Sequence, residues 1–94
     1  MAKTNSLGAL TILRRKQVEA ETGYSRSTIY LRIAEGLWPR PISLGARAVG
    51  WPASEVRSLN AARIAGNSND TIRRLVAQLL ASRAEAVVIG PHGA

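Results

Sequence analysis

The 94-residue sequence contains no cysteine, no phenylalanine and a single histidine. Without cysteine there is neither a disulfide framework nor a thiolate metal site, and His92 alone cannot build an imidazole site. We therefore expect no metal and no cofactor. No segment approaches the roughly 18 apolar residues that span a bilayer, and the N-terminus lacks the pattern of a signal peptide. These absences predict a cytoplasmic protein that makes no membrane contact and is held together by packing.

Acidic residues are also scarce, because six Asp and Glu stand against thirteen Lys and Arg, for a net charge of +7. The sequence has one histidine, near its C-terminal end, scattered carboxylates and no phosphate-loop motif. These residues do not supply a nucleophile, a general base and a third group that orients the base. We therefore predict that the protein is not an enzyme. Up to Gly66 there are ten basic and four acidic residues; after it there are three and two. The positive field belongs to the first two thirds of the chain and favours a nucleic acid as partner.

The stretch TGYSRSTIYLRIAEG has the outline of a helix-turn-helix. Residues 15–22 predict a short helix that ends at Gly23. Ser25 is a good N-cap residue, and an i, i+4 pair of isoleucines gives residues 25–35 an apolar face before Gly36 ends this second helix. Two short helices joined by a three-residue turn with a glycine are typical of this motif.

The run LWPRPISLGARAVGWP cannot be helical, because two prolines and two glycines interrupt it. Its apolar residues alternate on either side of a short turn, which predicts a hairpin over residues 42–51 with Arg47 at its tip. Trp38 and Trp51 flank this hairpin, and we expect them to anchor the core rather than to stack on bases.

Two further helices follow the hairpin. Pro52 suits the first turn of a third helix that ends at Gly66, and Ser68 or Asn69 caps a fourth helix over residues 70–84. The apolar stripe of this fourth helix either packs back on the domain or joins a second copy in a homo-oligomer. Its members are Ile72, Leu75, Val76, Leu79 and Leu80.

These elements predict one mainly α domain, a winged helix-turn-helix with a small β-hairpin wing and an extra C-terminal amphipathic helix. Residues 1–11 form a flexible arm, residues 12–66 form the winged helix-turn-helix, and residues 67–94 form the C-terminal helix and a tail, with oligomerisation as one role for this last part. The apolar run at residues 86–89 fits either a short strand or a tail.

Three segments in order, TGYSRSTIY, EGLWPRPISLG and RAVGWPASEV, resemble the AlpA family of phage and prophage regulatory proteins. These are similar to MerR-type winged helix-turn-helix domains and to phage excisionases. The resemblance implies a transcriptional regulator that binds double-stranded DNA at the nucleoid. Where the family commonly has arginine after the Ile-Tyr pair, this sequence has Leu31, followed by Arg32. With Ile29 in the core, Leu31 falls on roughly the opposite helix face and Arg32 lies nearer the core boundary.

The second predicted helix offers hydroxyls and a guanidinium at its N-terminus, where free backbone amides favour phosphate. We expect Arg26 and Ser27 to read base edges in the major groove, with the wing beside them; a plain helix cap with solvated neighbours is the alternative. The full set of predicted DNA contacts is Arg14, Arg15, Lys16, Ser25, Arg26, Ser27, Thr28, Tyr30, Arg32, Arg40 and Arg47.

Three functions remain open at this point. The protein is a transcriptional regulator at a promoter, an excisionase-like architectural factor that bends DNA, or a protein-interaction module such as an antitoxin.

Overall fold

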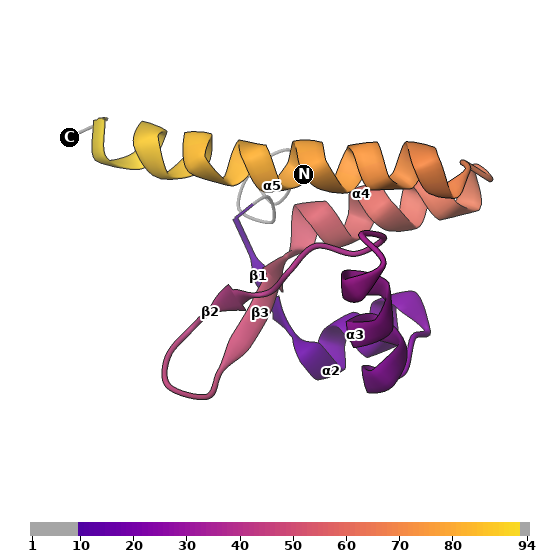
Figure 1. The fold of residues 1–94 in the computed structure, drawn as a ribbon. Coiled ribbons are helices and arrows are strands. Elements are labelled where there is room, and N and C mark those ends of the chain that lie inside the picture. Colours follow the sequence, from indigo (N-terminus) through magenta and orange to yellow (C-terminus); the bar gives the residue numbers. More distant parts are fainter. Residues whose placement is uncertain (1–9, 93–94) are drawn as a thin grey trace, which may run out of the picture.

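A computed structural model of the chain describes residues 10–92, with side chains described through residue 85. The elements, in order, are β1 (Ile12–Arg14), α2 (Arg15–Thr22), α3 (Arg26–Ala34), β2 (Ile42–Ser43), β3 (Val49–Pro52), α4 (Ala53–Ile64) and α5 (Asn69–His92). Figure 1 shows the wing hairpin, α2 and α3 on one side of the molecule and α5 on the other. The predicted fold class is confirmed: the chain is mainly helical, with a small antiparallel sheet compatible with a winged helix-turn-helix.

The turn between α2 and α3 forms as the sequence predicts. Gly23 has a φ of 78°, and its N–H donates to the Glu19 carbonyl oxygen at 2.8 Å, which ends α2. Glycine adopts this left-handed conformation without the penalty that a Cβ would bring. Ser25 then caps α3, because its Oγ accepts a hydrogen bond from the Thr28 N–H at 3.2 Å.

The sheet has one more strand than the predicted hairpin. Strand β3 lies in the middle, antiparallel to β1 on one side and to β2 on the other. Arg14 pairs with Gly50, and Leu13 pairs with Trp51. Strand β1 spans three residues, too few for an alternating pattern to be visible, and it is specified by pairing with a strand far along the chain. Residues 1–9 of the predicted arm, which was expected to cover residues 1–11, lie outside the described residues. The carbonyl oxygen of Thr11, within the predicted arm, accepts a hydrogen bond from the Ala53 N–H.

Both tryptophans are core anchors, as predicted. Trp51 is fully buried, and its Nε1 donates to the Pro39 carbonyl oxygen at 2.7 Å. Trp38 is also buried and meets the Tyr24 ring edge-to-face, with ring centroids 5.8 Å apart. The two indoles therefore connect the wing and the helix-turn-helix through one shared core.

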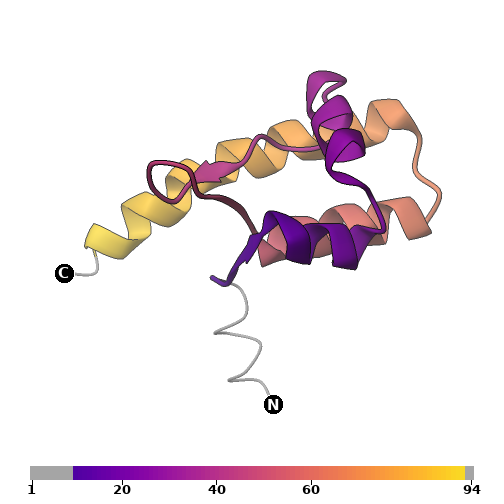
Figure 2. The ribbon, with the colours of Figure 1, turned by 90° about the horizontal axis from the view of Figure 1, so that it is seen from below.

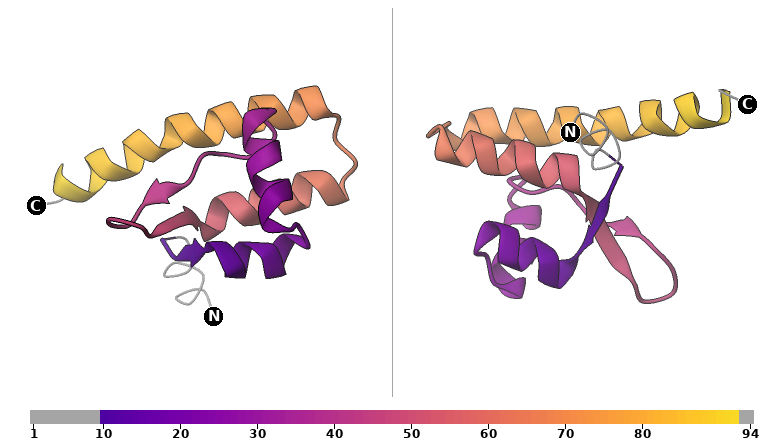
Figure 3. Two further views of the ribbon diagram at one scale, coloured as in Figure 1. Left: turned by 60° about the horizontal axis from the view of Figure 1, so that its bottom comes forward. Right: turned by 180° about the vertical axis from the view of Figure 1, so that it is seen from behind.

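Helix α5 runs beside α4, as the two views of Figure 3 show. Its apolar stripe packs within the domain: Ile72 and Val76 lie in the core, while Leu75, Leu79 and Leu80 are partly buried against it. A second copy could reach the buried pair only by displacing α5, and self-association through this helix stays a prediction.

Helix α5 is longer than the sequence indicates. It begins at Asn69, with the Ser68 Oγ accepting from the Thr71 N–H at 3.2 Å, and it ends at His92 rather than near Ala84. Residues 86–89 are therefore helical and form neither a strand nor an irregular tail. Once a helix is established, each added residue needs only its own hydrogen bond, so a helix can extend beyond its amphipathic part.

Two arginines of α5 attach it to the rest of the domain. Arg73 Nε donates to the Glu35 carbonyl oxygen at 2.9 Å, at the end of α3. Arg83 forms a bidentate pair with the buried carboxylate of Glu55, at 2.7 and 2.8 Å, and also donates to the Arg40 carbonyl oxygen at 2.9 Å. Helix α5 thus contacts both ends of the segment between α3 and the wing.

The close approach of β1 to Gly50 leads to a first prediction. A Cβ at this position would lie 2.6 Å from Ile12 Cγ2 and 2.9 Å from the Leu13 carbonyl oxygen. Because that oxygen belongs to the backbone of β1, Gly50→Ala must displace the strand. We expect the free energy of unfolding to fall by about 1 to 3 kcal/mol, measured by urea denaturation. Ser54→Ala, at an exposed position of α4, is the control and should change it by less than about 0.5 kcal/mol; equal stability of the two variants would contradict the packing argument.

The Glu55–Arg83 pair leads to a second prediction. Arg83→Met removes the cation but leaves the carboxylate buried, so we expect a loss of about 3 to 5 kcal/mol in the free energy of unfolding. Replacing both partners, as Glu55→Gln with Arg83→Met, should restore part of this loss, because no buried charge then remains. Arg74→Met, at an exposed position on the same helix, is the matched control. A double variant less stable than Arg83→Met alone would rule out this account.

Candidate nucleic-acid interface

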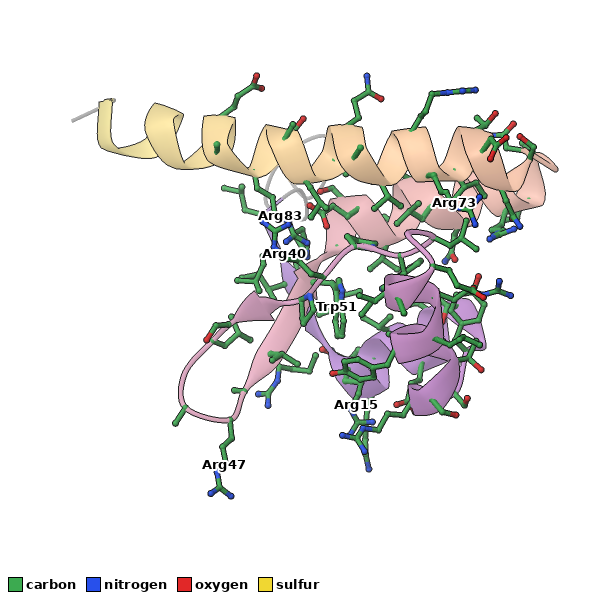
Figure 4. All side chains as sticks on the ribbon, viewed as in Figure 1. Arg15, Arg40, Arg47, Trp51, Arg73 and Arg83 are labelled. Atoms are coloured by element: carbon green, nitrogen blue, oxygen red, sulfur yellow. The ribbon has the colours of Figure 1, made fainter. Side chains whose placement is uncertain are left out.

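Basic side chains from two distant segments meet in one shallow concavity. It is lined by Arg14, Arg15, Lys16, Arg47 and Val49. The pairing of β1 with β3 explains the convergence, since it sets Arg14 opposite Gly50, three residues after the arginine of the wing tip. Arg15 and Arg47 point to the same side of the molecule, the side away from α5 (Figure 4). We call this group of five residues the basic concavity.

The cations of the basic concavity are only partly neutralised. Arg15 forms an ion pair with Glu19 at 2.6 Å, one turn further along α2. Within residues 10–85, Arg14, Lys16 and Arg47 have no carboxylate partner within 4.0 Å. Like charges gathered in this way repel one another in the free protein and attract a polyanion. Three of these cations are neighbours in the sequence, and the fold brings Arg47 to them.

A second concavity lies at the N-terminal end of α3, lined by Ser25, Arg26, Ser27 and Tyr30. The Arg26 guanidinium lies 5.8 Å from the centroid of the Tyr30 ring, at cation–π distance. Both side chains are exposed, so the guanidinium keeps its free donors for a ligand.

The hydroxyls at the start of α3 differ in what they contact. Ser25 Oγ lies 2.9 Å from Thr28 Oγ1 and 3.3 Å from Ser27 Oγ, in addition to capping the helix. Ser25 and Thr28 are therefore occupied by the cap, whereas the exposed Ser27 shares only a long contact. A helix start with this hydroxyl cluster still presents backbone amides to an anion.

Three of the predicted contacts line neither concavity. Thr28 is half-buried behind Ser25, to whose hydroxyl it is hydrogen-bonded. Arg32 is half-buried, 3.6 Å from a Glu35 carboxylate oxygen and 5.7 Å from the centroid of the Tyr24 ring. Arg40 is exposed, but it lies beside Arg83 near α5 rather than with Arg15 and Arg47 (Figure 4). The fold does not gather Arg32 and Arg40 with the other predicted contacts.

Figure 2 shows the wing, α2 and α3 in front of α4 and α5. Residues of the wing, of α3 and of the start of α2 line the two concavities. Two residues of this surface were not predicted from the sequence. Val49 lines the basic concavity, and Glu19 neutralises part of its charge. The i, i+4 spacing of Arg15 and Glu19 is the signal that predicts their pairing; the place of Val49 follows only from the strand register.

Residues 11–64, which contain both concavities, match the family described as Prophage CP4-57 regulatory protein (AlpA). The chain belongs to this AlpA family. It is also 48% identical over 54 residues to Uncharacterized protein ORF88 of Enterobacteria phage P4, a match that covers 57% of this chain and 61% of that protein. The chain thus spans less than two thirds of the length of this relative. No solved structure matches the chain.

The AlpA match runs from the start of β1 to the end of α4, so it agrees with the resemblance found in the sequence and leaves α5 outside. AlpA proteins form a regulatory family, not a family of enzymes. In the described part of the chain, no three His, Cys, Asp or Glu side chains are grouped to hold a metal ion. No described helix combines the length and apolar character needed to cross a membrane.

The two serines of α3 provide a matched pair for a third prediction. Ser25 caps the helix through the Thr28 N–H, whereas Ser27 accepts no backbone hydrogen bond from the described residues. We expect Ser25→Ala to lower the free energy of unfolding by about 1 kcal/mol and Ser27→Ala to leave it nearly unchanged. Thermal melts followed by circular dichroism measure both. Equal losses of stability in the two variants would contradict the assignment of the helix cap to Ser25 alone.

Proposed function

We propose that the chain is a sequence-specific regulator that binds double-stranded DNA and controls phage or prophage transcription. Helix α3, with its flanking residues 25–35, enters the major groove, and the wing at residues 42–51 lies beside it. The observation that carries this proposal is the basic concavity, in which Arg14, Lys16 and Arg47 gather without a carboxylate partner among the described residues. The AlpA family of prophage regulatory proteins supports the same class of function.

The basic concavity suits the DNA backbone. Its cations come from two segments, the junction of β1 with α2 and the wing tip. Each Lys or Arg that meets a phosphate releases a condensed counterion, which favours binding at low salt. These contacts position the protein without reading sequence, and Arg47 at the wing tip can also reach into an adjacent minor groove.

Helix α3 suits base readout. An α-helix fits the major groove of B-DNA, and in helix-turn-helix proteins the residues near the N-terminus of the second helix meet the base edges. Arg26 and Ser27 occupy that position and are exposed. The arginine fork pairs with O6 and N7 of guanine, and the serine hydroxyl can donate or accept. In this proposal, Tyr30 and the backbone amides at the N-terminus of α3 contact phosphates of the DNA.

The first experiment titrates binding across salt, comparing fragments from the chain's own gene neighbourhood with random DNA. If about four to six phosphates are neutralised, log affinity should fall with log salt at a slope near −4 to −5. An affinity for one fragment that is well above the affinity for random DNA supports the regulator proposal. Equal, weak binding to every fragment contradicts this proposal and favours a protein partner. A complex with such a partner should survive nuclease treatment. Bending by the bound protein, with a footprint spreading over repeats, would favour the excisionase-like architectural role.

Three arginine variants give the fourth prediction. Arg26→Ala should cost about 1 to 3 kcal/mol on the specific site and little on random DNA, because it removes a base contact. Arg47→Ala should weaken binding to both and reduce the salt slope by about 1. Arg74→Ala removes the same charge from an exposed position on α5 and is the control for net charge. A uniform loss in all three variants would show that only overall charge matters.

A further inference from the structure

Helix α3 has an exposed face that extends beyond the concavity at its start. Arg26, Ser27, Tyr30, Leu31 and Ala34 are all exposed, whereas Ile29 is fully buried on the other face. Residues at i, i+4 and i+7 form one stripe on a helix, so Ser27, Leu31 and Ala34 lie in line along the middle of this face. Leu31 is 57% exposed.

The chemistry of this face changes along the helix. Its first turn offers the guanidinium of Arg26 and the hydroxyl of Ser27, while its second turn offers the Leu31 side chain, which has no hydrogen-bonding group. With a rise of 1.5 Å per residue, Leu31 lies about 6 Å beyond Ser27 along the axis, less than two base-pair steps. A base contact at Ser27 would therefore bring Leu31 over a neighbouring base pair.

Tyr30 leaves Leu31 free to make this contact. The Tyr30 ring lies beside the Arg26 guanidinium, 5.8 Å from centroid to carbon, on the neighbouring ridge of the helix. Leu31 stands on the ridge of Ser27, and within the described residues it is not part of the core or of the layer packed against it. Its exposed apolar surface continues the face that carries the proposed base contacts.

We propose that Leu31 is a specificity-determining residue that reads a thymine through its C5-methyl group. In the major groove the thymine methyl is the one apolar feature of the base edges, and aliphatic side chains recognise it by contact. The proposal rests on the proposed function, because it requires α3 to lie in the major groove. The net charge of +7 and the basic concavity elsewhere on the domain favour DNA, rather than an apolar protein surface, as the partner of this face.

Deoxyuridine substitution provides the test, since it removes only the methyl group of a thymine. Using the fragment that the wild-type protein prefers, each thymine is replaced by deoxyuridine in turn. Losing one buried methyl corresponds to a decrease of about fourfold in affinity. We expect such a decrease at one or two positions for the wild-type chain, and none at those positions for Leu31→Ala, because that variant no longer touches the methyl.

Two control variants sharpen the result. Ile64→Ala removes an exposed aliphatic side chain from the end of α4, and it should keep the full sensitivity to deoxyuridine. Ser27→Ala should lower affinity while leaving the deoxyuridine effect in place. Leu31→Ala should fold, since the side chain is exposed and alanine favours helix, and circular dichroism melts check this.

The possible outcomes separate the two proposals. If the wild-type chain selects one fragment but no thymine is sensitive to deoxyuridine, or if Leu31→Ala keeps the same sensitivity, the role of Leu31 is wrong and the regulator proposal stands. If the wild-type chain selects no fragment at all, the regulator proposal itself fails. If Leu31→Ala alone abolishes the sensitivity, the thymine contact is established.

Discussion

Two neighbouring residues of strand β3, Gly50 and Trp51, impose the constraint on which the rest of the structure depends. Successive residues of a strand face opposite sides of its sheet. Trp51 therefore fills the core and holds the Pro39 carbonyl through its indole N–H, while Gly50 leaves the other side without a side chain. Strand β1 can then approach closely enough for its Ile12 side chain to cover Gly50. The same pairing carries Arg14 and the start of α2 to the base of the wing.

The charged surface follows from this packing rather than from local sequence. Arg14, Arg15 and Lys16 are neighbours in the chain, but Arg47 joins them only because β1 and β3 are paired. Their mutual repulsion opposes the stability of the free protein, and in the proposed complex with DNA the phosphates relieve this repulsion. The Arg15–Glu19 pair reduces this repulsion locally without removing the field, since the other cations have no such partner among the described residues.

The parts of the fold that the sequence predicted are those with local causes. Gly23 ends α2 and Ser25 begins α3 through contacts within a few residues, so the helix-turn-helix and its boundaries could be read directly. The tryptophans were recognisable as core because few large residues were available. Strand β1 could not be found in this way, because three residues show no period and their partner lies about 40 positions away. The predicted DNA contacts also divide into those with local and those with distant causes. The position of Arg26 in the first turn of α3 follows from the local sequence, whereas the place of Arg40 depends on its contact with α5.

Helix α5 has a role that neither its apolar stripe nor the family match suggests. It lies outside residues 11–64, yet Arg73 holds the carbonyl of Glu35 at the end of α3, and Arg83 holds that of Arg40 at the entry to the wing. These are the two ends of the segment that joins α3 to the hairpin of the wing. A duplex has fixed groove spacing, so base and backbone contacts can form together only if this segment keeps a fixed geometry. The buried Glu55 carboxylate accepts hydrogen bonds from Nε and Nη2 of the same guanidinium, which gives Arg83 one position rather than many. Helix α5 thereby holds both ends of this segment from the side of the molecule opposite to Arg15 and Arg47.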